Sequence, residues 1–350
     1  MSPLNSYDLP AFTWDCSRPL IEMHQIFKSF KTTAGDVPVL KGIDVNFECG
    51  QFVSVVGRSG SGKSTLVNML TGIDHPTRGS VKVADKPIHQ LSESEMSVWR
   101  GRNLGIVFQF FQLLPMLSLV ENVMLPMDFC NLYPPAEREK RAMSLLDQVG
   151  LADFAHKMPG AVAGGQQQSV AVARALANDP PILIADEPTG NLDARTAEQV
   201  IQLFEEQVAQ GKTVIMVTHD RDLARHAGRM LVIVDGELVN ETISQTFPEM
   251  RHRNLLALTR AAQARIYPAG QEIPLPADDA EHLYILRSGA LSVRQPGIEP
   301  GPIFTAGEWF TTDRLRQIGA AALQAGPAGA DLLEIPTPGM NLPIDAGRNT

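Results

Sequence analysis

A glycine-rich loop between a short apolar run and a helical run constrains the fold more than any other feature of this chain. Phe52–Val56 reads as a buried strand, and Leu66–Leu70 reads as the start of a helix. Glycines let the intervening loop curl so that successive backbone N–H groups face a phosphate. A glycine turn without a ligand is the alternative, which the strand–loop–helix context disfavours. We predict a nucleotide phosphate site formed by Gly57, Ser59, Gly60, Ser61, Gly62, Lys63, Ser64 and Thr65.

Two later segments also predict phosphate chemistry. The glycine pair Gly164-Gly165, followed by Gln166, opens what reads as a helix running to Ala177. The N–H groups at a helix start attract an anion. Another apolar run, residues 182–185, ends in Asp186 and Glu187, which places two carboxylates beside a metal ion and a water.

These segments suggest a division of roles around a bound nucleotide. Lys63 supplies a positive charge to the β- and γ-phosphates. Ser64 is expected to bind Mg²⁺ directly, and Asp186 is expected to interact with the ion indirectly, through the groups that bind it.

Composition limits the class of protein. With 350 residues the chain has room for about two domains, at roughly 150 residues each. The net charge of −9, without a long Lys/Arg run, argues against nucleic acid as the main partner. Cys16, Cys49 and Cys130 are far apart in sequence and have no metal-binding spacing, which fits a reducing compartment. No run of 18 apolar residues and no signal-peptide core are present, so we expect a cytoplasmic chain that reaches a membrane only through a partner.

The pattern along the chain predicts two domains of different class. Residues 1–19 read as a tail, and residues 20–245 alternate strands with helices, which is typical of a doubly wound α/β domain. Within it, Ser92–Glu95 reads as a capping box, and residues 135–149 and 194–210 read as amphipathic helices stopped by glycines. Residues 246–261 read as a connector, 262–340 as a small all-β domain rich in proline and glycine, and 341–350 as a second tail.

The first domain contains a series of motifs, which in order are Gly57–Thr65, Val107–Gln109, Leu113–Pro115, Val120–Val123, Gly164–Gln168, Ile182–Glu187, Gly190–Asp193 and Val217–Asp220. Through these motifs the domain resembles the ATP-binding subunits of ABC transporters, and is most similar to the branch with the lipoprotein-releasing, macrolide-export and cell-division ATPases. The resemblance implies a P-loop NTPase fold with a helical subdomain, ATP and Mg²⁺ as cofactors, a second ATP-binding subunit, and a separate membrane permease at the cytoplasmic face of the membrane.

The resemblance implies further roles, each with a structural alternative. Glu187 matches the catalytic carboxylate that polarises the attacking water; the alternative is a capping or salt-bridging acid. His219 matches the histidine that contacts the γ-phosphate, against a purely structural histidine. Gln109 matches the residue that senses Mg²⁺ and the water, against a plain polar loop residue. Phe30 matches the aromatic that stacks on adenine, against a core residue. Asp193 ends a motif that the resemblance places near the nucleotide.

The chain departs from the family pattern at Ala163, where the usual sequence is Leu-Ser-Gly-Gly-Gln. In the family this motif contacts the γ-phosphate held by Lys63 of the other subunit, and alanine lacks the serine hydroxyl. A hydrogen bond to a charged group contributes about 1.5–3 kcal/mol, so its loss in the transition state slows turnover about ten- to a hundredfold. Ser169 also stands where arginine is common, which removes a charge near the interface. A slow homodimer, or a heterodimer whose partner supplies a normal motif, fits this pattern.

The second domain resembles a cyclic-nucleotide-binding β-roll, through Tyr267–Ile273, Leu283–Val293 with a glycine turn, and Ala306–Phe310. The ligand signature is absent, because Gly319 stands at the arginine position and Thr311 follows Phe310. Arg314 and Arg316 read as solvated surface. We therefore expect no cyclic nucleotide binding, and a role in dimerisation or docking.

The sequence thus predicts an ATP-hydrolysing subunit that dimerises around ATP and drives a permease in export, lipid or lipoprotein extraction, or envelope signalling. A regulatory ATP-binding scaffold with little hydrolysis is the alternative. An ABC protein acting on DNA or ribosomes is disfavoured, because the chain has no second cassette and no basic tract.

Overall fold

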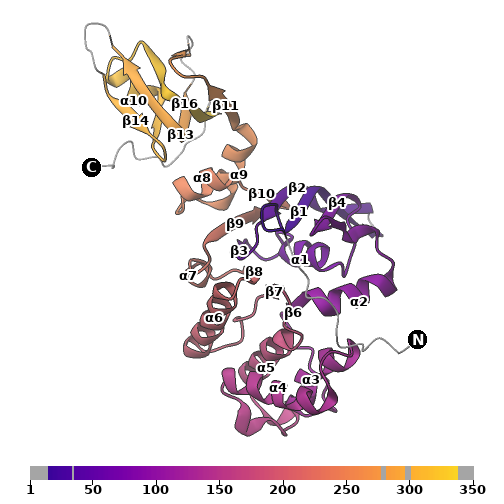
Figure 1. The fold of residues 1–350 in the computed structure, drawn as a ribbon. Helices are drawn as coiled ribbons and strands as arrows, with labels where there is room; N and C mark the ends of the chain where they lie inside the picture. Colours follow the sequence, from indigo (N-terminus) through magenta and orange to yellow (C-terminus); the bar gives the residue numbers. More distant parts are fainter. Residues whose placement is uncertain (1–14, 34, 277–280, 296–300, 338–350) are drawn as a thin grey trace. The chain divides into compact units, whose positions relative to one another are not determined.

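A computed structural model describes residues 15–33, 35–276, 281–295 and 301–337 (Figure 1). The chain forms two compact units, which divide between Leu238 and Val239. Most of the predicted N-terminal tail and the whole of residues 341–350 lie outside the described residues. The helices of the predicted connector belong to the second unit.

A mostly parallel six-stranded sheet forms the centre of the first unit, as the alternating strands and helices predicted (Figure 1). Every residue of β3, β7 and β8 is buried, which is expected for parallel strands covered on both faces. The strand order is β10 (Glu237–Leu238), β9 (Arg229–Val234), β3 (Phe52–Val56), β8 (Thr213–Thr218), β7 (Ile182–Asp186) and β6 (Leu104–Val107).

A separate antiparallel sheet precedes and flanks this core, and the sequence analysis did not predict it. Its longest pair, β1 and β2, runs antiparallel over most of both strands, with several register shifts. The prediction missed these strands because bulges interrupt their polar–apolar alternation, which is the sequence pattern of a half-buried strand. The strand order is β2 (Gly35–Phe47), β1 (Ile21–Thr32), β4 (Arg78–Val83) and β5 (Lys86–Pro87).

The helices of the first unit begin and end close to the predicted positions. Ser92 and Glu95 form the predicted capping box, and Gly150 and Gly211 follow their helices with positive φ angles. Helices α3, α4 and α5 pack on one another as a helical group (Figure 1). The helices are α1 (Lys63–Thr71), α2 (Glu93–Asn103), α3 (Leu119–Phe129), α4 (Pro135–Gln148), α5 (Gly164–Leu176), α6 (Ala194–Ala209) and α7 (Arg221–Ala224), with 3₁₀ turns at Ile88–Gln90, Ala152–Phe154 and Pro159–Ala161.

The second unit begins with α8 (Glu241–Thr246) and α9 (His252–Ala261) and continues as an antiparallel sheet. Its strands pair in the order β11-β16-β13-β14, with β12 on β16 and β15 on β13. The remaining elements are β11 (Gln263–Tyr267), β12 (Glu272–Pro274), β13 (His282–Arg294), β14 (Ile303–Thr305), β15 (Trp309–Thr311), α10 (Thr312–Gln317) and β16 (Ala322–Pro336).

The predicted glycine turn at Gly289 is wrong. Gly289 lies inside the continuous strand β13, at a register shift against β16. Its φ of +83°, and the 2.2 Å that would separate an added Cβ from the carbonyl oxygen of Gly329, explain why glycine is needed there. The glycine therefore bends a long strand instead of ending a short one.

Candidate functional site

The phosphate loop is a tight curl whose glycines cannot be replaced without moving the backbone. A Cβ added to Gly57 would lie 2.5 Å from the carbonyl oxygen of Ile233 and 2.6 Å from Oγ of Ser61. Gly60 and Gly62 have φ angles of +79° and +104°. Glycine is therefore needed at position 57 because of close packing, and at positions 60 and 62 because of the left-handed backbone.

The loop delivers Lys63 and the start of α1 to one place. The Lys63 side chain is buried, and its Nζ donates to the carbonyl oxygens of Gly57 (2.8 Å) and Arg58 (3.1 Å). Gly62 precedes the helix and no side chain caps it, so the first N–H groups of α1 are available to an anion. The hydroxyl of Ser61 is also buried without a hydrogen-bond partner. These donors fit a bound phosphate group.

Asp186 meets the same loop from the end of β7. Its carboxylate shares a hydrogen bond with Ser64 and lies near the charge of Lys63, while burial, the largest effect, raises its pKa. Its Oδ1 is buried and has no hydrogen-bond partner. An orphaned carboxylate oxygen beside a hydroxyl suits a Mg²⁺ ion that takes its other ligands from phosphates and water. Among the described residues no group of three or more His, Cys, Asp or Glu side chains could hold a metal ion.

Glu187 and His219 form a pair at the adjoining ends of β7 and β8. His219 Nδ1 lies 2.8 Å from Glu187 Oε2, with the glutamate buried and the histidine exposed. Glu187 also has a left-handed backbone, with φ of +49°, and its N–H donates to the carbonyl of Val217. Backbone of this kind persists where the surrounding structure enforces it, often at functional sites. The pair therefore holds a carboxylate beside the phosphate loop in a fixed position.

Phe30 and Gln109 are both presented to solvent. Phe30 lies on β1 with 41% of its surface exposed, so the core-residue alternative does not hold. Gln109 follows β6 and is exposed in a bend.

The glycine-pair helix begins where the sequence placed it. Ala163 precedes α5 with extended backbone, and its N–H donates to Oε1 of Gln166 at 3.0 Å. Ala163 and Gly164 are exposed, so they are accessible to a partner. A Cβ on Gly165 would lie 3.4 Å from the carbonyl oxygen of Asn191, which means that this helix start packs on the segment before Asp193.

Asp193, near this helix, and Ser169, within it, have structural roles that the sequence did not indicate. Asp193 caps α6, accepting hydrogen bonds from the N–H (3.1 Å) and hydroxyl (2.7 Å) of Thr196. Those bonds lower the pKa of Asp193. Ser169 is buried and donates to the carbonyl of Gly165. Ser169 therefore lies inside the unit, with its hydroxyl bonded to the backbone one turn earlier in the same helix.

Known proteins match this chain over the segment that contains the phosphate loop, Ala163 and Glu187. A family described as "ABC transporter" matches residues 40–190. The uncharacterised ABC transporter ATP-binding protein YvrO of Bacillus subtilis is 43% identical over 220 residues, which are 63% of this chain and 96% of that protein. This chain belongs to the ABC transporter ATP-binding family. The macrolide export ATP-binding/permease protein MacB of Burkholderia cenocepacia is 40% identical over 266 residues, which are 75% of this chain but 39% of MacB.

A solved cassette has the same fold. The dimeric structure of a post-hydrolysis state of the ATP-binding cassette MJ0796, bound to ADP and Pi, aligns with a TM-score of 0.61 and 40% identity. The alignment covers 63% of this chain and 97% of that cassette. The P-loop NTPase fold that the resemblance implied for the first domain is therefore confirmed.

The cassette also has a groove that sequence reasoning missed. It has a volume of about 830 Å³ and is lined by α2, β6, the end of α3 and the end of α5. Its apolar wall includes the exposed side chains of Val98 and Phe129. Arg174 contributes positive charge and donates to the carbonyls of Phe111 (2.9 Å) and Gln112 (2.7 Å), just after Gln109. No local sequence pattern marks this groove, because four separate elements form it.

In the second unit, glycine occupies position 319, where the β-roll resemblance requires an arginine. Gly319 follows α10 with φ of +71°. Arg314 lies over the Phe304 ring, and Arg316 pairs with Asp313. Glu308 accepts from the N–H and hydroxyl of Thr305. The absence of cyclic nucleotide binding stays a prediction.

Proposed function

We propose that this cassette binds and hydrolyses ATP, with Glu187 activating the attacking water. The observation that carries the proposal is the 2.8 Å contact between Glu187 and His219 beside the orphaned carboxylate oxygen of Asp186. A buried, fixed carboxylate can orient a water and accept its proton. His219, exposed at the strand end, would contact the γ-phosphate.

The loop residues would hold the nucleotide. The N–H groups at the start of α1 and the ammonium of Lys63 bind the β- and γ-phosphates. Ser64 and Asp186 would hold Mg²⁺, and Gln109 would approach it from β6. When bound, the ion neutralises the charge that develops between the two phosphates. Phe30, exposed on β1, would stack on the adenine ring.

Dimerisation would complete each site across two cassettes. The related cassette MJ0796 is a dimer in its post-hydrolysis state with ADP and Pi, and Ala163, Gly164 and Gly165 start α5 on the surface here. Because Ala163 lacks a hydroxyl, a homodimer would turn over slowly, whereas a heterodimer would pair this chain with a partner that supplies the hydroxyl. Asp193, which caps α6, would hold in place the segment that packs against the start of α5.

We also propose that the groove receives an apolar, acidic segment of a membrane permease. The relatives named MacB are ATP-binding/permease proteins, and the groove joins apolar surface to the guanidinium groups of Arg100, Arg102 and Arg174.

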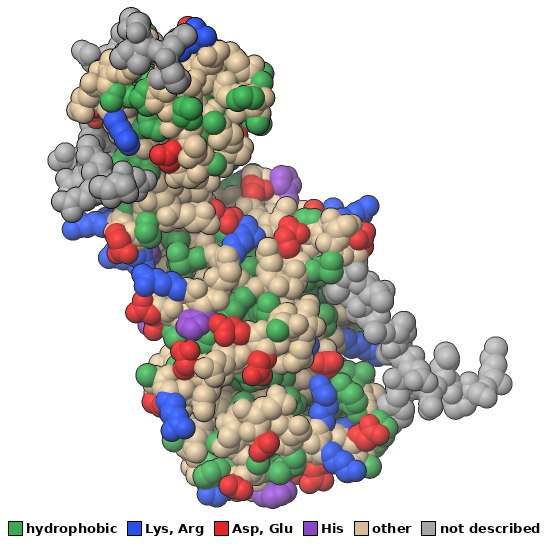
Figure 2. Space-filling view, turned by 60° about the vertical axis from the view of Figure 1, so that its left-hand side comes forward, with side chains coloured by type: hydrophobic (Ala, Val, Ile, Leu, Met, Phe, Trp, Pro, Cys, Tyr) green, Lys and Arg blue, Asp and Glu red, His purple; other side chains and the backbone are tan. Residues whose placement is uncertain are grey.

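No helix among the described residues has the length and apolarity needed to cross a membrane. The cassette would then act at the cytoplasmic face of a membrane. The charges on the face shown in Figure 2 are of mixed sign, in keeping with a protein partner rather than nucleic acid.

Phosphate release by the purified chain tests the proposal against the regulatory scaffold. Turnover that requires Mg²⁺ and is lost in Glu187→Gln supports the motor subunit. Tight ATP binding without phosphate release, in the presence of membranes from the source cell, supports the scaffold. Co-purification of the full chain from those membranes would identify the permease and any second cassette.

A further inference from the structure

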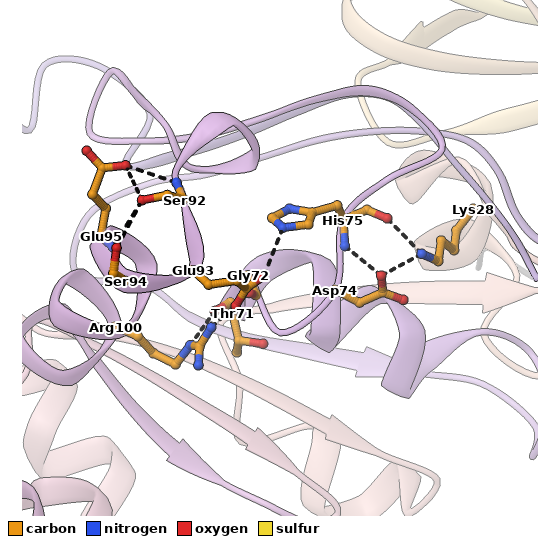
Figure 3. Close-up of polar contacts among 10 residues, drawn as sticks. All are labelled: Lys28, Thr71, Gly72, Asp74, His75, Ser92, Glu93, Ser94, Glu95 and Arg100. Carbon is orange, nitrogen blue, oxygen red and sulfur yellow. Dashed lines mark hydrogen bonds and ion pairs between the residues drawn. The ribbon is translucent and has the colours of Figure 1, made fainter.

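Lys28 is an unusually constrained lysine on the strand that carries Phe30. Only 12% of its side chain is exposed, although it lies two residues from the exposed aromatic ring. Its Nζ donates to Oδ1 of Asp74 at 2.6 Å and to the carbonyl of His75 at 2.8 Å (Figure 3). Burying an ammonium group is unfavourable unless it is paired and hydrogen-bonded, so this side chain is fixed in place.

The same ammonium lies over the Phe30 ring. The distance from Nζ to the ring centroid is 5.0 Å, within the range of a cation–π interaction. Phe30 pairs with Val37 across the β1–β2 hairpin, and Val37 is itself exposed. The ring is therefore partly open to solvent, and the anchored ammonium lies over one of its faces.

Lys28 also joins the ring to the phosphate loop. Asp74 and His75 follow α1, whose first residue is Lys63. The N–H of Asp74 donates to the carbonyl of Asn68 in the last turns of that helix. The segment is further tied to β1, because Thr77 N–H donates to the carbonyl of Phe27 and the Thr77 hydroxyl accepts from Ser29 N–H. One rigid path thus runs from the phosphate loop through α1 and Asp74 to Lys28.

We propose that Lys28 is a positioning residue for the nucleotide base: anchored on Asp74, it holds the Phe30 ring at a set distance from the phosphate loop and leaves the opposite face open to adenine. This inference rests on the proposed function, because it takes Phe30 as the adenine platform. It predicts that Lys28 contributes to binding of the base and not to binding of the phosphates.

The test compares two ligands that differ by the adenosine group. Calorimetric titration with ADP and with inorganic pyrophosphate, both with Mg²⁺, is carried out on the full chain and on Lys28→Met. A cation–π contact of about 0.5–2 kcal/mol corresponds to roughly 2- to 30-fold in affinity. We expect Lys28→Met to weaken ADP binding within that range and to leave pyrophosphate binding unchanged. Lys28→Arg, which keeps the charge, is expected to restore most of the ADP affinity.

Two further variants make the result decisive. Lys31→Met removes an exposed lysine from the same strand, and should change neither affinity, which excludes a general loss of positive charge. In a Phe30→Ala background, Lys28→Met should have no additional effect on ADP. Equal weakening of ADP and pyrophosphate by Lys28→Met would show that the residue only supports the fold, and no weakening of either would also overturn the inference.

Failure of the proposed function would look different. If Phe30→Ala leaves ADP affinity intact, the base binds elsewhere and Lys28 loses its role together with Phe30. If Phe30→Ala weakens ADP but Lys28→Met does not, the platform stands and the inference about Lys28 alone is wrong. If the wild-type chain binds neither ligand, both proposals are wrong.

Discussion

Nδ1 of His219 lies 2.8 Å from Oε2 of Glu187, across 32 residues of sequence. The contact joins the ends of two adjacent parallel strands, and the glutamate is fixed further by its left-handed backbone. A second His–Glu contact in the same unit, His226 Nδ1 to Glu205 Oε1 at 3.0 Å, involves the same atom types but lies near the start of β3, whereas the phosphate loop follows the end of that strand. The first unit therefore contains a candidate catalytic His–Glu pair and a second His–Glu pair whose glutamate can serve as the control for substitutions of Glu187.

Replacing Glu187 by glutamine should lower phosphate release at least about a hundredfold, because an amide cannot accept the water's proton. ADP affinity should stay near the wild-type value, since the substitution leaves Lys63 and the N–H groups at the start of α1 unchanged. The measurement is steady-state phosphate release with parallel ADP titration. Glu205→Gln should change neither quantity, and a similar loss of turnover in both variants would remove the special role of Glu187.

Replacing Ala163 by serine should have two separable effects. Ala163 precedes α5 with φ of −66° and ψ of 156°, which a capping serine adopts readily; a serine cap stabilises a helix by about 0.5–2 kcal/mol, so the melting temperature should rise. If the missing hydroxyl limits a homodimer, turnover should also rise about ten- to a hundredfold. Ala161→Ser, at an exposed position two residues earlier, is the control. A higher melting temperature with unchanged turnover would show that Ala163 does not limit hydrolysis.

Replacing Arg100 by methionine should destabilise the first unit. The guanidinium donates to the carbonyls of Thr71 (3.0 Å) and Gly72 (2.8 Å) at the end of α1 (Figure 3), and burial lowers its pKa. Hydrogen bonds to a charged group contribute about 1.5–3 kcal/mol, which for a unit of this size is about 3–10 °C in the melting temperature. Scanning calorimetry checks this. Arg102→Met, an exposed arginine on the same helix, should shift the melting temperature far less, and equal shifts would contradict the capping role.

Replacing Gly289 by alanine should destabilise the second unit. The positive φ costs a side chain about 1–2 kcal/mol, and the clash with the Gly329 carbonyl adds about 1–3 kcal/mol. Gly319→Ala has a similar φ but no atom within 4 Å of the added Cβ, so it should lose only the first contribution. Urea unfolding followed by Trp309 fluorescence, in a background in which Trp14 and Trp99 are replaced by phenylalanine, measures both variants. Equal losses would mean that the bend in β13 does not depend on close approach to β16.

Features encoded by short, continuous segments were predicted from the sequence. The glycine loop with Lys63, the strand ending in Asp186 and Glu187, and the capping box at Ser92 each depend on residues within a few positions of one another. Backbone sterics, strand burial and capping act over that range. Gly289 was misassigned as a turn because a positive φ is equally compatible with a turn and with a bulge, and only the partner strand distinguishes them.

By itself the sequence determined that this chain contains a P-loop domain, and it predicted a departure from the family signature at Ala163 and a second domain rich in turns. Only the tertiary structure decided the contact of His219 with Glu187, the groove beside Arg174, the burial of Ser169 and the anchoring of Lys28 on Asp74. Each of these depends on which distant segments pack together, and packing is set by the burial of the whole core, which no short window of residues contains.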